Sequence, residues 1–167
     1  MQRILVIGSP GSGKSRLSKI MAQKLNLPLI HLDQIFWLPN WTPLEKPVFK
    51  EKLIEELKKD RWILDGNFAS TLKLRLEYCD HVVFMNYPAW LCILRVLKRV
   101  ITNHGKTRPD MTEGCNEKLD IEFLKYIRDF KELRLKQLRN DLDQSGVAVT
   151  ELKNDRQVRK FIKSLNA

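Results

Sequence analysis

Eight residues near the amino terminus have the types and the spacing of a phosphate-binding loop. Gly8–Ser15 reads GSPGSGKS and fits the pattern G-x-x-x-x-G-K-[ST] at every fixed position. Gly11 and Gly13 permit positive φ angles and let the backbone approach an anion closely. Lys14 can reach phosphate oxygens, and the Ser15 hydroxyl can ligate Mg²⁺. The loop therefore predicts a site for nucleotide phosphates and Mg²⁺.

The segments on either side of this loop supply the frame that the motif requires. Arg3–Ile7 is a short apolar run typical of a buried strand, and Leu17, Ile20, Met21 and Leu25 recur at helical spacing behind the loop. The residues that we expect at the nucleotide are Gly8, Ser9, Pro10, Gly11, Ser12, Gly13, Lys14, Ser15 and Arg16, with Lys14 also catalytic. The alternative, a glycine-rich turn that binds nothing, is disfavoured by the complete motif in this frame.

Two carboxylates follow predicted strands of the same sheet. Asp33 follows the second strand, and Asp65 begins the run Asp65-Gly66-Asn67 after the third. Ligands gather at the carboxyl ends of parallel strands. Either acid can hold Mg²⁺ together with Ser15, or accept a proton from a substrate hydroxyl. The competing interpretation for each acid is a helix cap or a turn residue.

Four arginines can supply charge to a moving phosphoryl group. Arg95 and Arg99 are four residues apart and share one helix face. Arg134 lies on the apolar stripe of a long predicted helix, and Arg108 lies in a long loop. Guanidinium groups suit phosphoryl transfer, so we expect these four to be catalytic. The alternative is that each lies over its own helix with its head in water.

An aromatic cluster follows Asp33 in the sequence. Phe36, Trp37 and Trp41 could stack on a planar ligand such as a base. They could equally form a small satellite core under a loop. Phe36 and Trp37 are therefore candidate substrate residues, whereas the basic cluster at 156–160 lies off the apolar stripe of its helix and is expected at the surface.

Strands and helices alternate along the chain, which predicts a parallel α/β sheet. The predicted strands are 3–7, 28–32, 62–64, 81–85 and 146–150. Thr42 and Glu45 have capping-box spacing and predict a helix start near Pro43, although Pro47 leaves that start open. A further helix is expected from about 118 to 140. The polar segment between, about 102–117, has no periodicity and is expected to be a lid.

Composition limits the class of protein. The length of 167 residues predicts a single domain over 1–167, and no apolar run could cross a bilayer. The sequence shows no secretory signal, and its three separated cysteines indicate neither disulfides nor zinc, so a cytoplasmic location is expected. The net charge of +10 is compatible with nucleic-acid binding or with a site that holds several phosphates.

These motifs together resemble a known family. The chain is similar to the adenylate-kinase-like P-loop proteins of bacteria that are often labelled "DNA topology modulation protein". The resemblance covers almost the whole chain. It rests on Gly8–Ser15, His31-Leu32-Asp33, Trp37-x-Pro39-x-Trp41, Trp62–Asn67, Arg95-x-x-x-Arg99, Arg108-x-Asp110 and the segment from Phe123 to Arg134.

The resemblance implies a P-loop NTPase fold with a five-stranded parallel sheet of order 2-3-1-4-5 and a mobile lid. It implies ATP and Mg²⁺ as cofactors, an acceptor over Asp33 and Asp65-Gly66-Asn67, and an adenine near Thr150–Asn154. One departure concerns the acceptor. Adenylate kinases carry Asp-Gly-Phe-Pro-Arg where this chain has Asp65-Gly66-Asn67, so the usual arginine is absent there. Arg75 is the candidate replacement.

Three functional hypotheses remain open at this stage. The first is a Mg²⁺-ATP-dependent kinase for a nucleoside or nucleoside monophosphate. The second is an ATP-binding regulator associated with DNA, which the absence of a helix-turn-helix or zinc signature disfavours. The third is a kinase for a polyhydroxylated acid such as gluconate or shikimate, with Asp33 on the hydroxyls. The sequence does not determine the oligomeric state.

Overall fold

Five parallel strands form the central sheet of the structure, a computed structural model that describes residues 1–165. Across the sheet the order is β2 (Leu29–His31), β5 (Trp62–Asp65), β1 (Arg3–Gly8), β6 (His81–Met85) and β7 (Ala148–Leu152). Every neighbouring pair is parallel. Numbered along the chain, these strands have the order 2-3-1-4-5, so the predicted α/β topology is confirmed.

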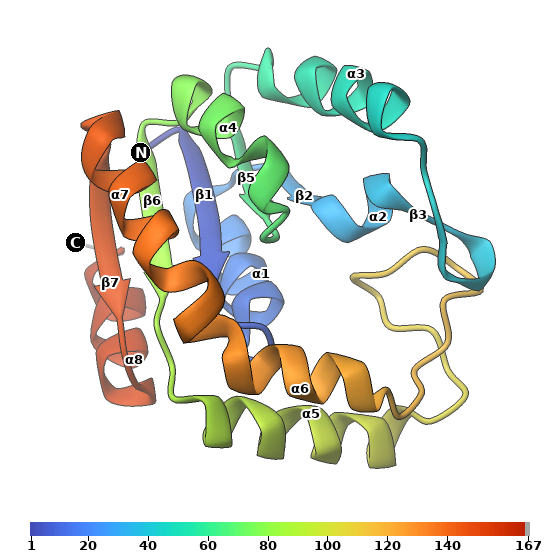
Figure 1. Ribbon diagram of the computed structural model, residues 1–167. Coiled ribbons are helices and arrows are strands. Elements are labelled where there is room, and N and C mark those ends of the chain that lie inside the picture. The colour runs from blue at the N-terminus through green and yellow to red at the C-terminus, as the bar shows by residue number, and fades with distance from the viewer. Residues whose placement is uncertain (166–167) are drawn as a thin grey trace.

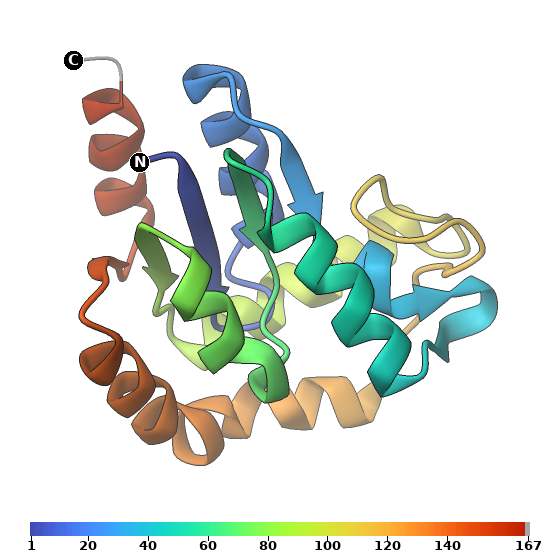
Figure 2. The same cartoon turned by 90° about the horizontal axis from the view of Figure 1, so that it is seen from above.

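Helices cover both faces of the sheet (Figures 1 and 2). One face packs against α1 (Lys14–Leu25), α5 (Ala89–Asn103), α6 (Ile121–Phe130) and α8 (Asp155–Ser164). The other packs against α3 (Lys46–Leu57), α4 (Leu72–Tyr78), which follows the 3₁₀ turn η2 (Ala69–Thr71), and α7 (Lys136–Ser145). Ile4, Leu5 and Val6 are fully buried. Their continuous apolar run in β1 reflects burial on both faces.

The segment between β2 and α3 differs from its prediction. It contains α2 (Leu32–Phe36), β3 (Trp37–Leu38), the 3₁₀ turn η1 (Pro39–Trp41) and β4 (Thr42–Pro43). The predicted helix start near Pro43 is wrong, because Pro43 pairs with Trp37 in a small antiparallel ladder and the Leu44 amide donates to the Phe36 carbonyl at 2.7 Å. The helix starts at Lys46 instead, with Pro47 in its first turn.

The long helix predicted over 118–140 is interrupted and displaced. Asp120 caps α6 by accepting a hydrogen bond from the Phe123 amide at 3.0 Å. A π-helical turn, η3 (Lys131–Leu135), joins α6 to α7, and Gly146 ends α7 in the left-handed conformation. The last strand therefore begins at Ala148, two residues later than predicted.

The predicted lid lies beside the segment that carries the aromatic cluster (Figures 1 and 2). Residues 104–120 contain two isolated bridges, one of which pairs Thr107 with Asn116. The Trp41 indole donates to the Asn116 carbonyl at 3.1 Å, and the Gln34 amide donates to the Pro109 carbonyl at 2.9 Å. Within residues 1–165, no helix has both the length and the apolar composition that crossing a bilayer requires.

Candidate active site

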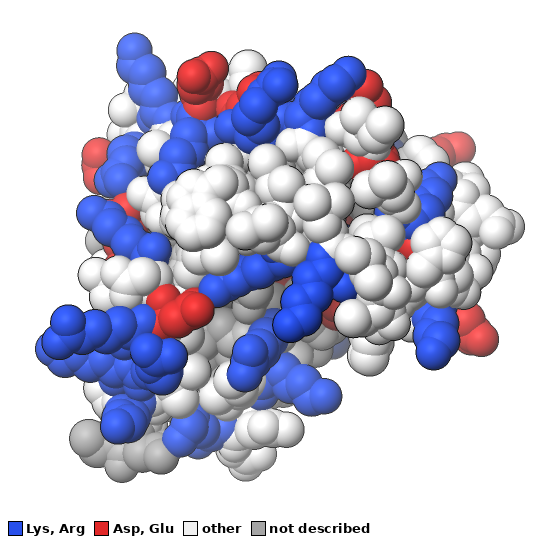
Figure 3. All heavy atoms as spheres, turned by 90° about the horizontal axis from the view of Figure 1, so that it is seen from below, with Lys and Arg blue, Asp and Glu red and all other residues white. Residues whose placement is uncertain are grey.

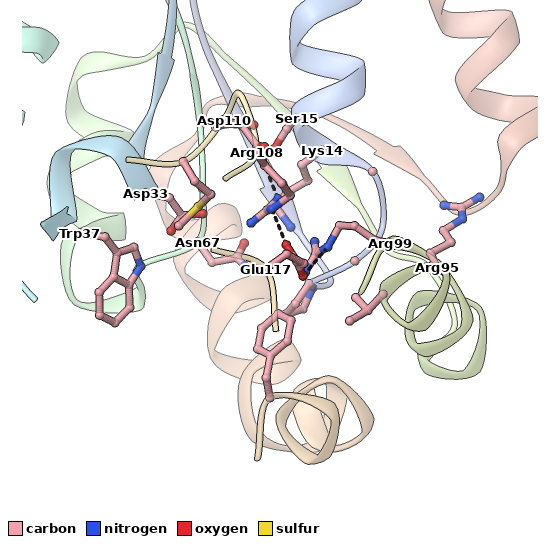
Figure 4. A pocket seen from close by; sticks show the side chains of 18 of the residues that line it. Lys14, Ser15, Asp33, Trp37, Asn67, Arg95, Arg99, Arg108, Asp110 and Glu117 are labelled. Atoms are coloured by element: carbon pink, nitrogen blue, oxygen red, sulfur yellow. Dashed lines mark hydrogen bonds and ion pairs between the residues drawn. The ribbon is translucent and has the colours of Figure 1, made fainter. Parts of the chain in front are cut away.

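A cavity of about 880 Å³ opens at the carboxyl edge of the sheet. Its walls come from the phosphate-binding loop, α2 and β3, the end of β5, α5, the 104–120 segment, α6 and η3 (Figure 4). Of the predicted site residues, those that line it are Pro10, Gly11, Gly13, Lys14, Ser15, Arg16, Asp33, Trp37, Asp65, Gly66, Asn67, Arg95, Arg99, Arg108 and Arg134. Gly8, Ser9, Ser12, Phe36 and Arg75 do not line it.

Backbone packing fixes the start of the phosphate-binding loop. Gly8 has a φ of 134°, and a Cβ there would lie 2.2 Å from the Met85 carbonyl oxygen. The Ser9 amide donates to that same carbonyl at 2.9 Å. Only glycine permits this close approach of β1 to β6. Gly8 and Ser9 therefore fix the conformation of the loop without lining the cavity.

Lys14 begins α1 with its ammonium group inside the loop. It donates to the carbonyl oxygens of Gly8 at 3.1 Å and Ser9 at 3.0 Å. Burial lowers the pKa of Lys14 from its ordinary value, while the negative charges of Asp65 and Asp33 oppose that shift. The ammonium group is therefore held by weak neutral acceptors, which a phosphate oxygen can replace at a gain in electrostatic energy.

Asn67 joins the end of β5 to the phosphate-binding loop. Its side-chain oxygen accepts from the Gly8 amide at 3.1 Å. Gly66, with a φ of 133°, lies so close to α2 that a Cβ would be 2.7 Å from Leu32 Cβ. The Asp65-Gly66-Asn67 run thus connects the end of β5 to the phosphate-binding loop and to α2 beside the cavity.

The two predicted acids have different surroundings. Asp65 Oδ1 lies 2.7 Å from His31 Nδ1, whereas Asp65 Oδ2 is buried with no hydrogen-bond partner in the described chain. Burial alone would lower the pKa of His31, but the hydrogen bond and the charge of Asp65 raise it. Asp33 lies in the first turn of α2, and burial, followed by the charge of Asp65, raises the pKa of its carboxyl. Sequence reasoning missed His31 as a partner of Asp65, although the motif His31-Leu32-Asp33 contains it.

The donor set fits Mg²⁺ held mainly by phosphates and water. Within residues 1–165, no three His, Cys, Asp or Glu side chains gather as a metal site. Mg²⁺ in nucleotide sites uses only one or two protein oxygens. Ser15 lines the cavity, and the unpaired Asp65 Oδ2 belongs to a second lining residue. These residues, with Asp33 as the alternative acid, could hold the ion.

Arg95 is tied to the back of the phosphate-binding loop. Its guanidinium donates to the Ser12 carbonyl at 2.7 Å and to the two Asp155 carboxylate oxygens at 2.7 and 2.9 Å. It also lies 4.7 Å from the centre of the Tyr87 ring. Asp155 was not predicted, because it comes from α8 at the other end of the chain. These contacts assign Arg95 a role in holding the loop, in addition to its place in the cavity wall.

Arg99 and Arg108 meet at a buried carboxylate that the sequence did not reveal. Glu117 is 5% exposed. Its Oε1 accepts from Arg99 Nε at 3.0 Å, and its Oε2 lies 2.7 Å from Arg108 Nε without the alignment of a hydrogen bond. Arg108 also donates to Asp110 at 2.9 Å. Burial, and then the charge of Arg108, lower the pKa of Arg99. Figure 4 shows this network in the middle of the cavity.

Arg134 reaches the cavity from the π-helical turn η3. Such turns widen the helix locally and are frequent at functional sites. The sequence predicted Arg134 on the apolar face of a regular α-helix. In the structure Arg134 lines the cavity, but the backbone that positions it is a π-helical turn.

The aromatic cluster divides between the cavity and the core. Trp37 and Trp41 line the cavity, with ring centres 5.7 Å apart. Phe36 packs instead against Phe49 and Phe68, at centroid distances of 5.1 and 4.6 Å. Phe36 therefore belongs to a small core, as one interpretation of the sequence has it, whereas stacking of Trp37 or Trp41 on a planar ligand stays a prediction.

The suggestion that Arg75 grips the acceptor requires correction. Its side chain is 0% exposed, and its guanidinium donates to the carbonyls of Gly66 at 2.9 Å and Phe68 at 3.0 Å and to that of Asn67. Desolvation lowers its pKa, while the surrounding carbonyl oxygens favour the charged form. Arg75 therefore holds the backbone of residues 66–68 beneath the cavity and does not reach into it.

The segment Thr150–Asn154, expected near an adenine, also lies outside the cavity lining. The Asn154 side chain caps α8 by accepting from the Gln157 amide at 3.0 Å. Asn154 and Asp155 are both residue types that favour a helix N-cap, and the structure selects Asn154. An adenine contact by this segment remains a prediction.

Comparison with known proteins finds adenylate kinases of similar sequence and solved kinase structures of similar fold. No family model matches the chain. It is 32% identical over 155 residues to an adenylate kinase of Ruminiclostridium cellulolyticum, covering 68% of this chain and 72% of that one. It is 30% identical over 191 aligned positions to an adenylate kinase of Wigglesworthia glossinidia brevipalpis, covering 96% and 89%. A shikimate kinase structure from Bacteroides thetaiotaomicron superposes with a TM-score of 0.60 at 20% identity, covering 98% of this chain and 96% of that one, which indicates a shared fold.

Proposed function

We propose that this chain, which belongs to the adenylate kinase family of P-loop kinases, transfers a phosphoryl group from ATP to a small molecule bound beside Asp33 and Trp37. Membership of this family makes the chain an ATP-dependent kinase. The acceptor and the roles of individual residues are the proposal. One observation carries it: a single cavity joins the complete phosphate-binding loop to arginines and carboxylates from distant parts of the chain.

The reaction follows from the placement of these groups. An acceptor oxygen, which belongs to a hydroxyl group or to the phosphate of a nucleoside monophosphate, forms a bond to the γ-phosphorus, the bond from that phosphorus to the β,γ-bridging oxygen breaks, and ADP leaves. Asp33, which has no partner in the described chain, is available to take the hydroxyl proton. Lys14, Arg99, Arg108 and Arg134 stabilise the charge on the transferring group. Mg²⁺, when bound near Ser15, supplies further charge neutralisation at the phosphates.

The 104–120 segment serves as a lid in this proposal. It brings Arg108 and Glu117 to the cavity and hydrogen bonds to the segment that carries Trp37 and Trp41. Closure of such a segment excludes water, which would otherwise accept the phosphoryl group. We place the activity in the cytoplasm because the three cysteines are all free and buried.

Two classes of phosphoryl acceptor are compatible with this ATP site. One is a nucleoside or a nucleoside monophosphate, and the other is a polyhydroxylated acid of the gluconate or shikimate kind. A DNA-associated regulator that affects DNA topology is the alternative outside catalysis, and it rests on the net charge of +10. The kinase is favoured because the complete phosphate-binding loop and basic side chains, among them Lys14, Arg99 and Arg134, line one cavity.

Replacement of Lys14 tests the kinase directly. Lys14→Ala should reduce ADP formation with any active acceptor by about a hundredfold or more, because it removes a charge aimed at the phosphates. Lys24→Ala, an equivalent change on the exposed face of the same helix, is the matched control and should keep wild-type activity. Circular dichroism and thermal unfolding check that both variants are folded.

The outcome separates the alternatives. Acceptor-dependent ADP formation that disappears only in Lys14→Ala supports the kinase and identifies the acceptor. Transfer by a folded Lys14→Ala at a rate near wild type would contradict the assignment. Tight ATP binding without turnover on any acceptor would favour the regulatory alternative.

A further inference from the structure

The phosphate-binding loop is held from outside at two points. The Ser9 hydroxyl donates to the Tyr87 carbonyl at 3.2 Å, and the Ser12 carbonyl accepts from the Arg95 guanidinium at 2.7 Å. Tyr87 follows β6, and Arg95 belongs to α5. The conformation of the loop therefore depends on side chains and backbone that lie far from it in the sequence.

A single carboxylate from the last helix joins these two supports. Asp155 lies in the first turn of α8, and its Oδ1 accepts from the Tyr87 hydroxyl at 2.7 Å. Its two oxygens also accept from the Arg95 guanidinium at 2.7 and 2.9 Å. The same guanidinium lies 4.7 Å from the centre of the Tyr87 ring. Asp155 and Tyr87 together thus determine where the Arg95 guanidinium lies.

The exposure of these groups indicates what the contact does. Hydrogen bonds from Tyr87 and then from Arg95 lower the pKa of the Asp155 carboxyl, so it is ionised at neutral pH. The Asp155 side chain is 58% exposed and that of Arg95 is 30% exposed. An ion pair in contact with water contributes little to the free energy of unfolding. Its effect is therefore expected on the orientation of Arg95 and not on the stability of the fold.

The orientation of Arg95 fixes one peptide group of the loop. Figure 4 shows the Arg95 side chain directed away from Lys14 and the centre of the cavity. The Ser12 carbonyl donates its lone pairs to that outer guanidinium, and the peptide bond between Ser12 and Gly13 is trans. In a trans peptide the carbonyl and the following amide point in opposite directions. The Gly13 amide is thus turned inward, where an anion in the loop can accept from it.

We propose that Asp155 is a positioning residue for ATP. It holds Arg95 in place, Arg95 holds the peptide group between Ser12 and Gly13, and the Gly13 amide is thereby kept ready for a nucleotide phosphate. The inference rests on the proposed kinase function, because it places ATP on this loop. It goes beyond that function by making the affinity for ATP depend on a side chain of the last helix.

Replacement of Asp155 tests the effect on ATP. Asp155→Ala should raise the Kd of a non-hydrolysable ATP analogue with Mg²⁺, measured by calorimetry without acceptor, by about tenfold. Tyr87→Phe keeps the ring under Arg95 but removes the hydroxyl, so its Kd should rise less, by about threefold. Asp143→Ala, at an exposed position on α7, is the control and should keep the wild-type Kd.

Two further readouts separate positioning from a general loss of structure. In steady-state assays of Asp155→Ala, the KM for ATP should rise with the Kd, while kcat at saturating ATP changes by less than about twofold. In the ligand-free protein, amide hydrogen exchange in peptides from 8–16 should become faster, because the loop opens more often. Exchange in β1 and β6 and the midpoint of thermal unfolding should stay near their wild-type values.

Each result bears on the inference separately from the kinase proposal. An unaltered Kd in Asp155→Ala would overturn the inference, and so would weaker ATP binding without faster exchange in 8–16, since Arg95 would then act only by touching the nucleotide. Faster exchange throughout the chain would overturn it as well, because it indicates a loss of stability alone. A wild-type protein that binds no ATP analogue would count against the kinase, whereas unchanged exchange in 8–16 would count against the positioning role.

Discussion

Glu117 shows how one side chain can connect two groups that the sequence presents separately. Arg99 belongs to α5 and Arg108 to the 104–120 segment, and the buried carboxylate of Glu117 contacts both. Burial and then the charge of Arg108 lower the pKa of Arg99, because two guanidinium groups this close repel each other. The carboxylate compensates that repulsion and keeps both groups at the cavity. Glu117 is therefore a positioning residue for the two arginines.

Replacement of Glu117 by glutamine should reduce kcat and leave ATP binding largely intact. The amide keeps the shape but loses the charge, so Arg99 and Arg108 are no longer held together. A charge-assisted hydrogen bond contributes about 1.5–3 kcal/mol, so we expect kcat to fall about tenfold or more. The KM for ATP should change by less than about twofold, because the phosphate-binding loop remains complete.

Steady-state kinetics with ATP varied at a saturating acceptor concentration measure both values. Glu113→Gln, a change at an exposed position of the same segment, is the control. An unchanged kcat in Glu117→Gln would contradict the positioning role. Equal changes of kcat and KM in both variants would indicate only a general loosening of the segment.

At the scale of elements, the 104–120 lid is bonded to the segment that carries Trp37 and Trp41, and the two act as one unit. Thr112 donates to the Trp37 carbonyl at 2.5 Å, and the Cys115 thiol donates to the Leu38 carbonyl at 3.3 Å. These bonds link 104–120 to β3, so the lid can move away from the cavity only if they break. Segments with few core contacts supply such local openings.

Thiol labelling should report that opening. Cys115 is 1% exposed, and its thiol lies at the contact between the two segments, where it donates to the Leu38 carbonyl. Cys92 lies in the core, and burial raises the pKa of Cys79 to about 11, which suppresses its thiolate. We therefore expect Cys115 to react first with an alkylating reagent, and more slowly when an ATP analogue and an acceptor are bound.

Peptide mass spectrometry after timed labelling identifies the modified cysteine, and Cys115→Ser is the control that should remove the fast reaction. Faster modification of Cys79 or Cys92 would be incompatible with a lid at 104–120. A Cys115 rate that ligands do not change would be incompatible as well.

At the scale of the whole molecule, the positive charge does not form one continuous stripe on the face that carries α5. Seen from below, an uncharged band crosses the surface with Lys and Arg side chains on both sides of it (Figure 3). The exposed apolar residues of α5, the lowest element in Figure 1, include Trp90, Leu94 and Ile101. Phosphate tracking by DNA-binding proteins uses a connected basic surface. Most of the net charge of +10 lies outside the cavity, because basic and acidic residues nearly balance in its lining.

Duplex DNA should accordingly bind only weakly and without sequence preference. We expect affinity at low salt that falls steeply between about 50 and 200 mM salt, because the binding comes from counterion release alone. Fluorescence anisotropy with linear and supercoiled DNA, with and without saturating ATP, measures this. Binding that persists at physiological salt and prefers one form of DNA would revive the regulatory alternative.

The sequence by itself determined the parts of this protein that depend on short stretches of chain. The phosphate-binding loop, the alternation of strands and helices and the cap at Asn154 are local patterns of residue type and spacing. The strand order came from the resemblance to a family. The placement of Asp33 and Asp65 at one edge then followed from the parallel sheet.

Only the tertiary structure decided which side chains meet. The pairs Arg99–Glu117, His31–Asp65 and Gly8–Asn67 join residues 18, 34 and 59 positions apart. Strand pairing also overrode a local helix signal, since the ladder between Trp37 and Pro43 prevented the predicted helix start. Arg75 has no local feature that marks it as buried. Its role depends on carbonyl groups that approach only after α4 packs beneath the loop that follows β5.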